Sequence, residues 1–450
     1  MTEYTTMNFR SRIPILFFLI VLTSACQKRA EGNQTITPQL QTTTLPQANP
    51  TRDPQTKAAI QPDATKTVTL EPETHQPTSD AVSSCAMPPQ TTILKPPVIP
   101  KQITGRIGLY VARIPSGTKE FSPIKVIQIN PQGQFPLASN FKQSVLYSLM
   151  KQVDQGYVKL VEKFVITNAN RSYGEYPFDN SNVQALATRM IQSSDNTATD
   201  ILFRRIGIGS VQPIVNDLHL CNTRVLLPTK TWWTAQAGLG GKDFPKYALV
   251  KATQKFATYP LEAQLKIAAR LDAQAQATNP EIMRRFLDNG YFAGRNGGVE
   301  TMSQIDRNIQ NASTPAEWAR FIHHEFINSG LTNSSRKMFR DIMLLGKGRH
   351  LLRVPFSYFG GKSGNTARVL TYSGYLETKS GDRLIYVYFN DSSLNLTTRD
   401  ETPLAFNLIN ASLKKIMRPE DLILPKKPLQ TKDISKLGGQ GKAQAKSIGN

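Results

Sequence analysis

The stretch Phe135-Pro-Leu-Ala-Ser-Asn-Phe-Lys142 sets a serine, Ser139, three positions before a lysine. Apolar residues recur every four positions over residues 141–153, which predicts a helix with one buried face that begins near Ser139. Residues three apart share a helix face, so we expect the Lys142 amine beside the Ser139 hydroxyl. The partial positive charge of a helix N-terminus lowers the pKa of a nearby lysine, and a neutral amine can take the serine proton. By itself the pattern is weak, because it occurs by chance about once or twice in a chain of this length. The alternative is an exposed serine and a solvated lysine.

A second motif, Ser194-Asp195-Asn196, lies between two stretches with helical patterns. Its serine hydroxyl could relay a proton to a leaving nitrogen, and its asparagine amide could bind both a substrate carbonyl and a lysine. The alternative is a helix cap, because Ser, Asp and Asn are the favoured N-cap residues. Taken alone, this motif favours the cap.

A third motif, Lys362-Ser363-Gly364, directly precedes a predicted strand over residues 367–376. Lys362 could supply positive charge for a substrate carboxylate, and Gly364 would let a substrate lie close along the strand. The competing interpretation is a phosphate-binding loop, since the motif and the glycine before it end like one. Such a loop requires a glycine where Phe356 stands, which excludes it.

The hydrophobic patterns place strands at both ends of the folded region and helices between them. Strands are expected at residues 107–114 and 124–129, and again at 367–376 and 382–389. The predicted helices cover residues 183–192, 260–275, 280–287, 315–328, 334–345 and 402–416. The sequence therefore predicts an α/β domain over residues 101–425, with a sheet built from both termini and a helical subdomain inserted.

In their order, the three motifs resemble the signature of the class A β-lactamases and penicillin-binding proteins: Ser-x-x-Lys, then Ser-Asp-Asn, then Lys-[Ser/Thr]-Gly. The segments 135–142, 190–198 and 313–318 are similar to the corresponding family segments, and the resemblance covers residues 105–417. It implies a β-lactamase-like α/β fold with an antiparallel sheet and an all-helical subdomain.

The resemblance also implies a mechanism in which Ser139 attacks a cyclic or peptide amide carbonyl and forms an acyl-enzyme. Lys142 would be the base or part of the proton relay, and Ser194 would pass a proton to the departing nitrogen. The backbone amides of Ser139 and Asn365 would form the oxyanion hole. The substrate-binding residues that it implies are Asn196, Lys362, Ser363, Gly364, Asn365 and Arg368.

One departure from the family pattern concerns the release of the acyl group. Class A enzymes carry a glutamate on a loop after the second motif, and it activates the water that clears the acyl-enzyme. The corresponding loop is expected at residues 226–233, where this chain has Thr229-Lys230-Thr231 and no carboxylate. Glu262 or Asp243 could approach the site, although nothing in the sequence requires it. Acylation is therefore better supported than efficient turnover.

The resemblance leaves three functions open. They are a β-lactamase, a penicillin-binding enzyme acting on D-alanyl peptides of peptidoglycan, and a wall-binding lipoprotein that keeps the fold without turnover. The missing glutamate favours the second and third, whereas the whole-domain resemblance favours the first. A Gly-x-Ser-x-Gly motif is absent from the sequence, which argues against an α/β-hydrolase. His323-His324-Glu325 is not a zinc motif, so we expect neither metal nor cofactor.

The N-terminus is typical of an exported protein. Two arginines precede a short apolar run over residues 13–22, and Thr23-Ser-Ala-Cys26 follows. This pattern predicts a signal peptide over residues 1–26 that ends in a lipobox-like cysteine, although Thr23 stands where that motif usually has leucine. We expect lipid on Cys26, which would anchor the domain to the cell membrane or outer membrane, in the periplasm or cell-wall space. An uncleaved signal anchor is the alternative.

The remaining polar segments and the charge suggest how the domain is presented. Residues 27–100 are rich in Thr, Gln and Pro and predict a disordered stalk, and residues 426–450 predict a basic flexible tail. The net charge of +21 suits anionic partners such as membranes or wall polymers, or it reflects a solvated basic surface. We expect a monomer that binds a β-lactam or a peptidoglycan peptide, and no nucleic acid. Export would permit a disulfide between Cys85 and Cys221.

Overall fold

The computed structural model describes residues 91–174, 176–293, 298–394 and 401–423. They all belong to one compact unit, His75–Asn450, whereas the other unit, Met1–Thr74, lies outside the described residues. The signal peptide, Cys26, Cys85, the basic tail and most of the stalk also lie outside them, so the interpretations of these parts stay predictions. Within the described residues, no helix is long and apolar enough to cross a membrane.

A six-stranded sheet in the order β1-β3-β2-β12-β11-β10 forms the centre of the unit. Its neighbouring strands are antiparallel, except that β1 runs parallel to β3. The strands are β1 (Thr92–Leu94), β2 (Arg106–Ile114), β3 (Lys125–Ile129), β10 (Tyr358–Asn365), β11 (Leu370–Glu377) and β12 (Arg383–Asp391). The prediction of a sheet built from both ends of the domain is confirmed.

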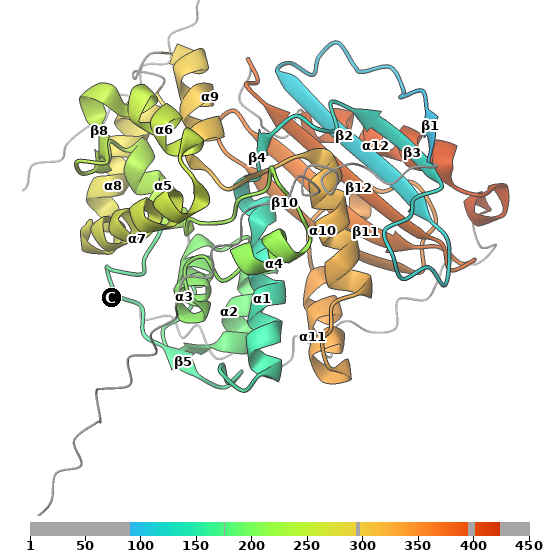
Figure 1. Ribbon diagram of the computed structural model, residues 1–450, viewed down its shortest axis with the longest axis horizontal. Helices are drawn as coiled ribbons and strands as arrows, with labels where there is room; N and C mark the ends of the chain where they lie inside the picture. Colours follow the sequence, from blue (N-terminus) through green and yellow to red (C-terminus); the bar gives the residue numbers. More distant parts are fainter. Residues whose placement is uncertain (1–90, 175, 294–297, 395–400, 424–450) are drawn as a thin grey trace, which may run out of the picture. The chain divides into compact units, whose positions relative to one another are not determined.

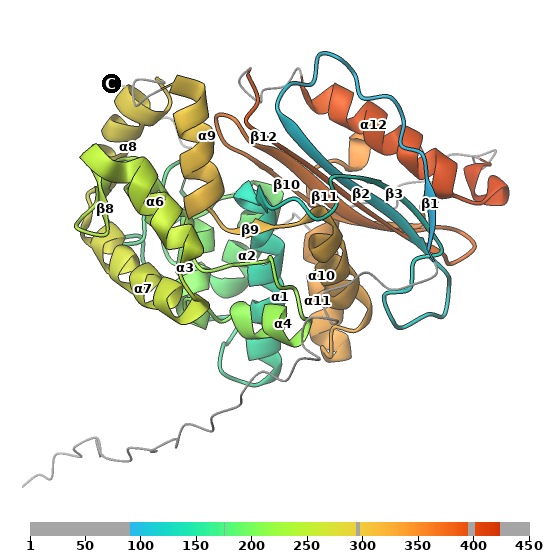
Figure 2. The same ribbon diagram turned by 45° about the horizontal axis from the view of Figure 1, so that its top comes forward.

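Both faces of this sheet are buried, because successive residues of its strands are apolar and point to opposite faces. On β2, Tyr110 and Ala112 join the large core shared with the helices, whereas Leu109 and Val111 join a second core beneath α12 (Glu401–Ile416). Figures 1 and 2 show α12 on one face of the sheet and α10 with α11 on the other. The helical subdomain adjoins the edge of the sheet formed by β10.

The helices between the two halves of the sheet form the inserted subdomain and the layer beneath the sheet. Their bounds are α1 (Lys142–Asp154), α2 (Val183–Gln192), α3 (Asn196–Ile206), α4 (Gln212–Asp217), α5 (Thr229–Gln236), α6 (Leu249–Thr258), α7 (Leu261–Ala277), α8 (Pro280–Phe286), α9 (Gly298–Ile309), α10 (Pro315–Ile327) and α11 (Asn333–Leu344). Side-chain caps start several of them: the Asn182 side chain accepts a hydrogen bond from Ala185 N at α2, and the Thr314 side chain accepts one from Glu317 N at α10. The predicted helices agree with the observed bounds to within two residues.

Short elements complete the path of the chain. Strand β4 (Phe135–Pro136) pairs with β9 (Ala312–Ser313) and thereby fixes the segment that leads to Ser139. Two further hairpins pair β5 (Lys163–Phe164) with β6 (Ser181–Asn182), and β7 (Leu239–Gly240) with β8 (Phe244–Pro245).

The structure corrects four expectations about elements. The stalk does not extend to residue 100, because β1 pairs with β3 and belongs to the sheet. Ser139 lies in a 3-10 turn, Ala138–Phe141, and the α-helix starts only at Lys142. The third motif is part of β10 itself and does not merely precede a strand. The expected loop over residues 226–233 is largely the helix α5.

Candidate active site

The fold brings the three motifs together at the edge of the sheet where the helical subdomain begins. Ser139 is half-buried on the turn before α1, and Lys142 is the first residue of that helix. Ser194 and Asn196 lie where α2 gives way to α3, and Lys362 comes from β10. Segments far apart in the sequence therefore form one site.

Lys142 is completely buried, and its amine is held by neutral acceptors. Its Nζ donates to the Ser194 carbonyl oxygen at 2.6 Å and to Asn196 Oδ1 at 2.6 Å. Burial lowers the pKa of Lys142 to about 7, and Asp200 and Asp195 only partly offset this effect. A substantial fraction of Lys142 is therefore a free amine at neutral pH, as a general base requires.

The Ser194 hydroxyl lies between two lysines. Lys362 Nζ donates to Ser194 Oγ at 2.9 Å, and Lys142 Nζ lies 3.3 Å from the same oxygen. Lys362 is also fully buried, and its pKa is lowered well below the usual value by burial and then by Lys142 and Lys347. Ser194 has a positive φ of 58°, a backbone conformation that residues other than glycine rarely adopt. This arrangement connects the two amines through one hydroxyl, which can relay a proton.

The other two residues of the second motif, Asp195 and Asn196, form different hydrogen bonds. Asp195 caps α3 by accepting from Ala198 N at 2.9 Å, so the expected cap is present. Asn196 accepts from Lys142 through Oδ1, and its Nδ2 donates to the Tyr173 carbonyl oxygen at 2.6 Å. These bonds fix the orientation of the Asn196 amide toward the site.

Glycine at position 364 lets β10 come close to the turn that carries Ser139. A Cβ atom there would lie 2.4 Å from Ser139 N, a distance that side chains essentially never show. Thr371 Oγ1 donates to the Leu137 carbonyl oxygen at 3.0 Å and ties the same turn to β11. Since β10 is the outer strand of the sheet, its free edge beside Ser139 can receive an extended substrate.

The segment where the deacylation loop was expected, residues 226–233, forms hydrogen bonds to buried carboxylates of the helical subdomain. Thr231 Oγ1 donates to Asp272 at 2.6 Å, and Asp272 also pairs with Arg204 at 2.8 Å. Asp200 accepts from Thr229 N at 2.6 Å and from Lys230 N at 2.7 Å. These buried carboxylates therefore stabilise the start of α5.

Three residues that were considered for the site have other partners in the structure. The Glu262 side chain is 80% exposed and pairs with Lys266, and Asp243 pairs with Arg270. No contact of either carboxylate with Ser139 or Lys142 is seen among the described residues. Arg368 Nη1 donates to the Leu394 carbonyl oxygen at 2.6 Å, so its guanidinium is bound to the segment after β12.

Several residues that shape the site were not predicted. Asp200 stands four residues after Asn196 on α3, a spacing that could have placed it on the same face. Tyr173 and Lys347 come from loops far away in the sequence, and no local pattern indicates them. His323 is buried beneath the sheet, and His324 Nε2 lies 3.0 Å from Tyr147 OH. Among the described residues, no group of three metal-ligating side chains occurs.

Comparisons with known proteins agree with this geometry at the level of the family. A model described as the β-lactamase enzyme family matches residues 97–411. Among solved structures, an ancestral class A β-lactamase is 15% identical, with 70% of this chain and 96% of that chain covered and a TM-score of 0.46. A variant extended-spectrum β-lactamase is 12% identical, with 70% and 94% covered and a TM-score of 0.46. A search of curated protein sequences finds no match.

Proposed function

The chain belongs to the β-lactamase enzyme family, and from that premise we propose that it opens β-lactam amides through an acyl-enzyme on Ser139. The observation that carries the proposal is Lys142, a buried amine with a pKa of about 7 placed one helical turn from that serine. With this pKa, part of Lys142 is already a free amine at neutral pH and can take the serine proton.

The proposed acylation uses each motif once. The Lys142 amine takes the proton of Ser139 Oγ as this oxygen attacks the carbonyl carbon. The developing oxyanion is bound by the backbone amides of Ser139 and Asn365. The carbon–nitrogen bond then breaks, and the leaving nitrogen receives the proton of the Ser194 hydroxyl, which Lys142 restores. A bound substrate carboxylate would favour the charged form of Lys362, whose Nζ also donates to Ser194 Oγ.

A penicillin-binding enzyme acting on D-alanyl peptides is the second candidate function. The observation that favours it is the hydrogen bond from Thr231 on α5 to Asp272 on α7, which engages a hydroxyl on the segment where the family carries its glutamate. Such a site would form an acyl-enzyme and release it slowly. The third function, a wall-binding lipoprotein that does not hydrolyse its ligand, would follow if the acyl-enzyme were not released at all.

Mass spectrometry of the intact protein tests the proposal. Incubation with benzylpenicillin should add the mass of one penicillin, and peptide mapping should place it on Ser139. The adduct should vanish in Ser139→Ala and persist in Ser193→Ala, which changes an exposed serine next to the second motif. An adduct that survives in Ser139→Ala would remove this serine from the role.

A further inference from the structure

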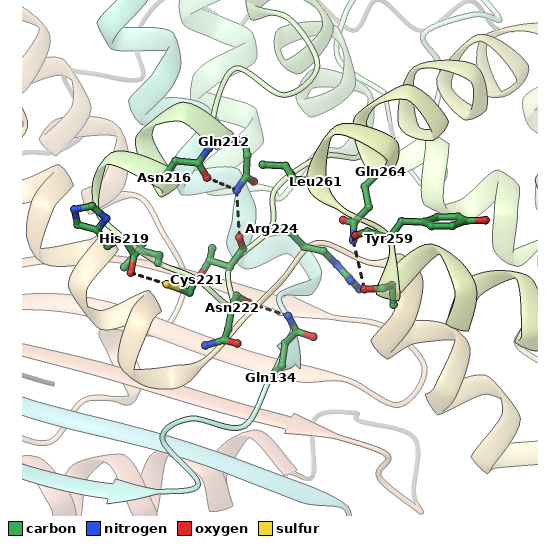
Figure 3. Close-up of a pocket in the computed structure, with 13 residues that line it drawn as sticks. Gln134, Gln212, Asn216, His219, Cys221, Asn222, Arg224, Tyr259, Leu261 and Gln264 are labelled. Atoms are coloured by element: carbon green, nitrogen blue, oxygen red, sulfur yellow. Dashed lines mark hydrogen bonds between the residues drawn. The ribbon is translucent and has the colours of Figure 1, made fainter. Parts of the chain in front are cut away.

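A second concave site lies away from the catalytic serine, beside α4 and the start of α7. It is a cavity of about 410 Å³, which is in the size range of small-molecule sites. Figure 3 shows Arg224 among the lining residues, between Gln264 and the loop that carries Asn222. Ser139, Lys142 and Lys362 are not among its lining residues. The cavity is therefore distinct from the site described above.

Arg224 is a buried cation that lacks an acidic partner among the described residues. Its Nη2 donates to the carbonyl oxygens of Arg307 at 2.9 Å and Asn308 at 2.6 Å, and Nε donates to that of Gln310 at 3.4 Å. These neutral acceptors at the end of α9 leave Nη1 without a hydrogen bond to a described residue. Burial alone lowers the pKa of Arg224 to about 10, with no carboxylate to offset the loss of hydration. Buried charges are normally paired, so an anion from outside the chain would complete this site.

The rest of the cavity wall is suited to hydroxyl groups. Five carboxamides line it, namely Gln134, Gln212, Asn216, Asn222 and Gln264. Gln264 Nε2 donates to the Tyr259 carbonyl oxygen at 2.9 Å, and Gln212 Nε2 donates to Asn216 Oδ1 at 3.1 Å. These bonds fix the amides and leave Gln264 Oε1 and Asn216 Nδ2 for a ligand. Carboxamides both donate and accept, as recognition of hydroxyls requires.

We propose that this cavity binds a small sugar acid, with its carboxylate on Arg224 and its hydroxyls on the carboxamides. The Leu261 side chain, which Figure 3 shows beside Gln212 and Gln264, offers an apolar surface for the sugar ring. The lining contains no Asp or Glu, and the carboxylate of Glu317 behind the wall is engaged by hydrogen bonds from Asn222 and Thr223. The site is independent of the acyl-enzyme chemistry and does not rest on it.

Calorimetric titration of the full chain with two matched sugars tests this inference. N-acetylmuramic acid carries a carboxylate on a lactyl group, and N-acetylglucosamine lacks that group. The acid should bind at least about tenfold more tightly, since a charge-assisted bond to Arg224 is available to it alone. Equal binding of the two sugars, or no saturable binding of the acid, would overturn the proposal.

Variants at the exposed rim keep the test valid even if Arg224 cannot be replaced without unfolding. Asn216→Asp retains the oxygen that accepts from Gln212 and adds a negative charge at the entrance. It should weaken the acid about three- to tenfold more than the neutral sugar, because both sugars lose the Asn216 Nδ2 donor and only the acid is repelled by the new charge. Asn333→Asp, at the exposed start of α11, is the matched control and should change neither. An identical response of both variants would contradict the location.

Discussion

At the scale of single residues, three lysines of different exposure determine the charge of the site. Lys142 and Lys362 are buried, whereas Lys347 is exposed on the segment that follows α11. That segment is held against β10, because a Cβ atom at Gly346 would lie only 1.7 Å from the Gly361 carbonyl oxygen. The positive charge of Lys347 lowers the pKa of both buried lysines. Lys347 therefore acts on the base from outside the motifs.

The rate of acylation should rise with pH through about 7, because only the free amine of Lys142 can take the serine proton. Lys347→Gln removes a neighbouring positive charge, which stabilises the protonated form of Lys142 and raises its pKa. The rising limb should therefore move to higher pH, and the rate at pH 7 should fall by about two- to fivefold. Stopped-flow acylation by benzylpenicillin across pH 5–9 measures this. Arg349→Gln, two residues further along, is the control, and an equal displacement of its profile would contradict the assignment.

The sequence predicted the residues of the three motifs because each motif is local. The spacing of Ser139 and Lys142 defines one helical turn, and no long-range information is needed to see it. Arg368 stays a predicted carboxylate ligand, and its hydrogen bond to the Leu394 carbonyl oxygen, which comes from a different part of the chain, could not be foreseen from the sequence. Lys347 was missed for the same reason, since only the folded chain places it near β10.

At the scale of elements, the contact between β10 and the turn before α1 defines the width of the site. Gly364→Ala would force a methyl group against Ser139 N and push the strand outward. We expect acylation to slow by about a hundredfold, since displacements of about 1 Å have such effects on catalysis. Overpacking should also cost about 1–3 kcal/mol of unfolding free energy. Acylation kinetics and thermal unfolding measured on the same sample separate the two effects, and an unchanged rate in a folded variant would sink the idea.

Asp306, a buried carboxylate on α9, accepts hydrogen bonds from four side chains. Its carboxylate accepts from Tyr291 OH at 2.7 Å, from Gln310 Nε2 at 2.9 Å and from Thr366 Oγ1 at 3.3 Å, and Gln236 Nε2 also donates to it. Burial nevertheless raises the pKa of Asp306 to about 7. Since the folded state holds this proton more tightly than the unfolded chain, the stability that it contributes is greatest below pH 4 and is lost as pH rises through about 7.

The Asp306→Asn variant should remove this pH dependence. The free energy of unfolding of the wild type should fall between pH 5 and pH 8 by more than that of the variant, and the difference should be on the order of a few kcal/mol. Thermal unfolding at several pH values measures it. Asp341→Asn, at an exposed ion pair on α11, should keep the wild-type slope. Parallel curves for wild type and Asp306→Asn would exclude Asp306 as the responsible group.

The amphipathic helices and strands could be predicted, because their buried residues recur at the spacing typical of a helix or a strand. Helix α2 and the alternating strand β2 were placed correctly on that basis. The helix α5 was expected as a loop, because its apolar residues are mixed with buried polar ones such as Lys230 and Thr231. Their hydrogen bonds to Asp200 and Asp272 come from distant helices, so no local pattern shows that they are buried.

At the scale of the whole molecule, the packing of the helical subdomain determines the environment of the segment where the deacylation loop was expected. Helices α6 to α8 lie around α5 in Figure 1. Asp272 on α7 receives the hydroxyl of Thr231 and the guanidinium of Arg204. Helix α7 thus holds α5 in place through Asp272, whose carboxylate binds both of these groups.

We therefore expect deacylation to be slow. Water attacks an ester poorly unless a nearby base takes its proton, and such a base is worth about 10²–10⁴-fold. Thr231 cannot replace a carboxylate, because a hydroxyl is barely basic at neutral pH and this one donates to Asp272. Glu262 and Asp243 are paired on the surface with Lys266 and Arg270. A chromogenic cephalosporin should give a burst of one product per protein and then a low steady rate, with the acyl-enzyme persisting by mass spectrometry. Rapid full turnover would show instead that another group, with Lys142 as the first to examine, activates the water.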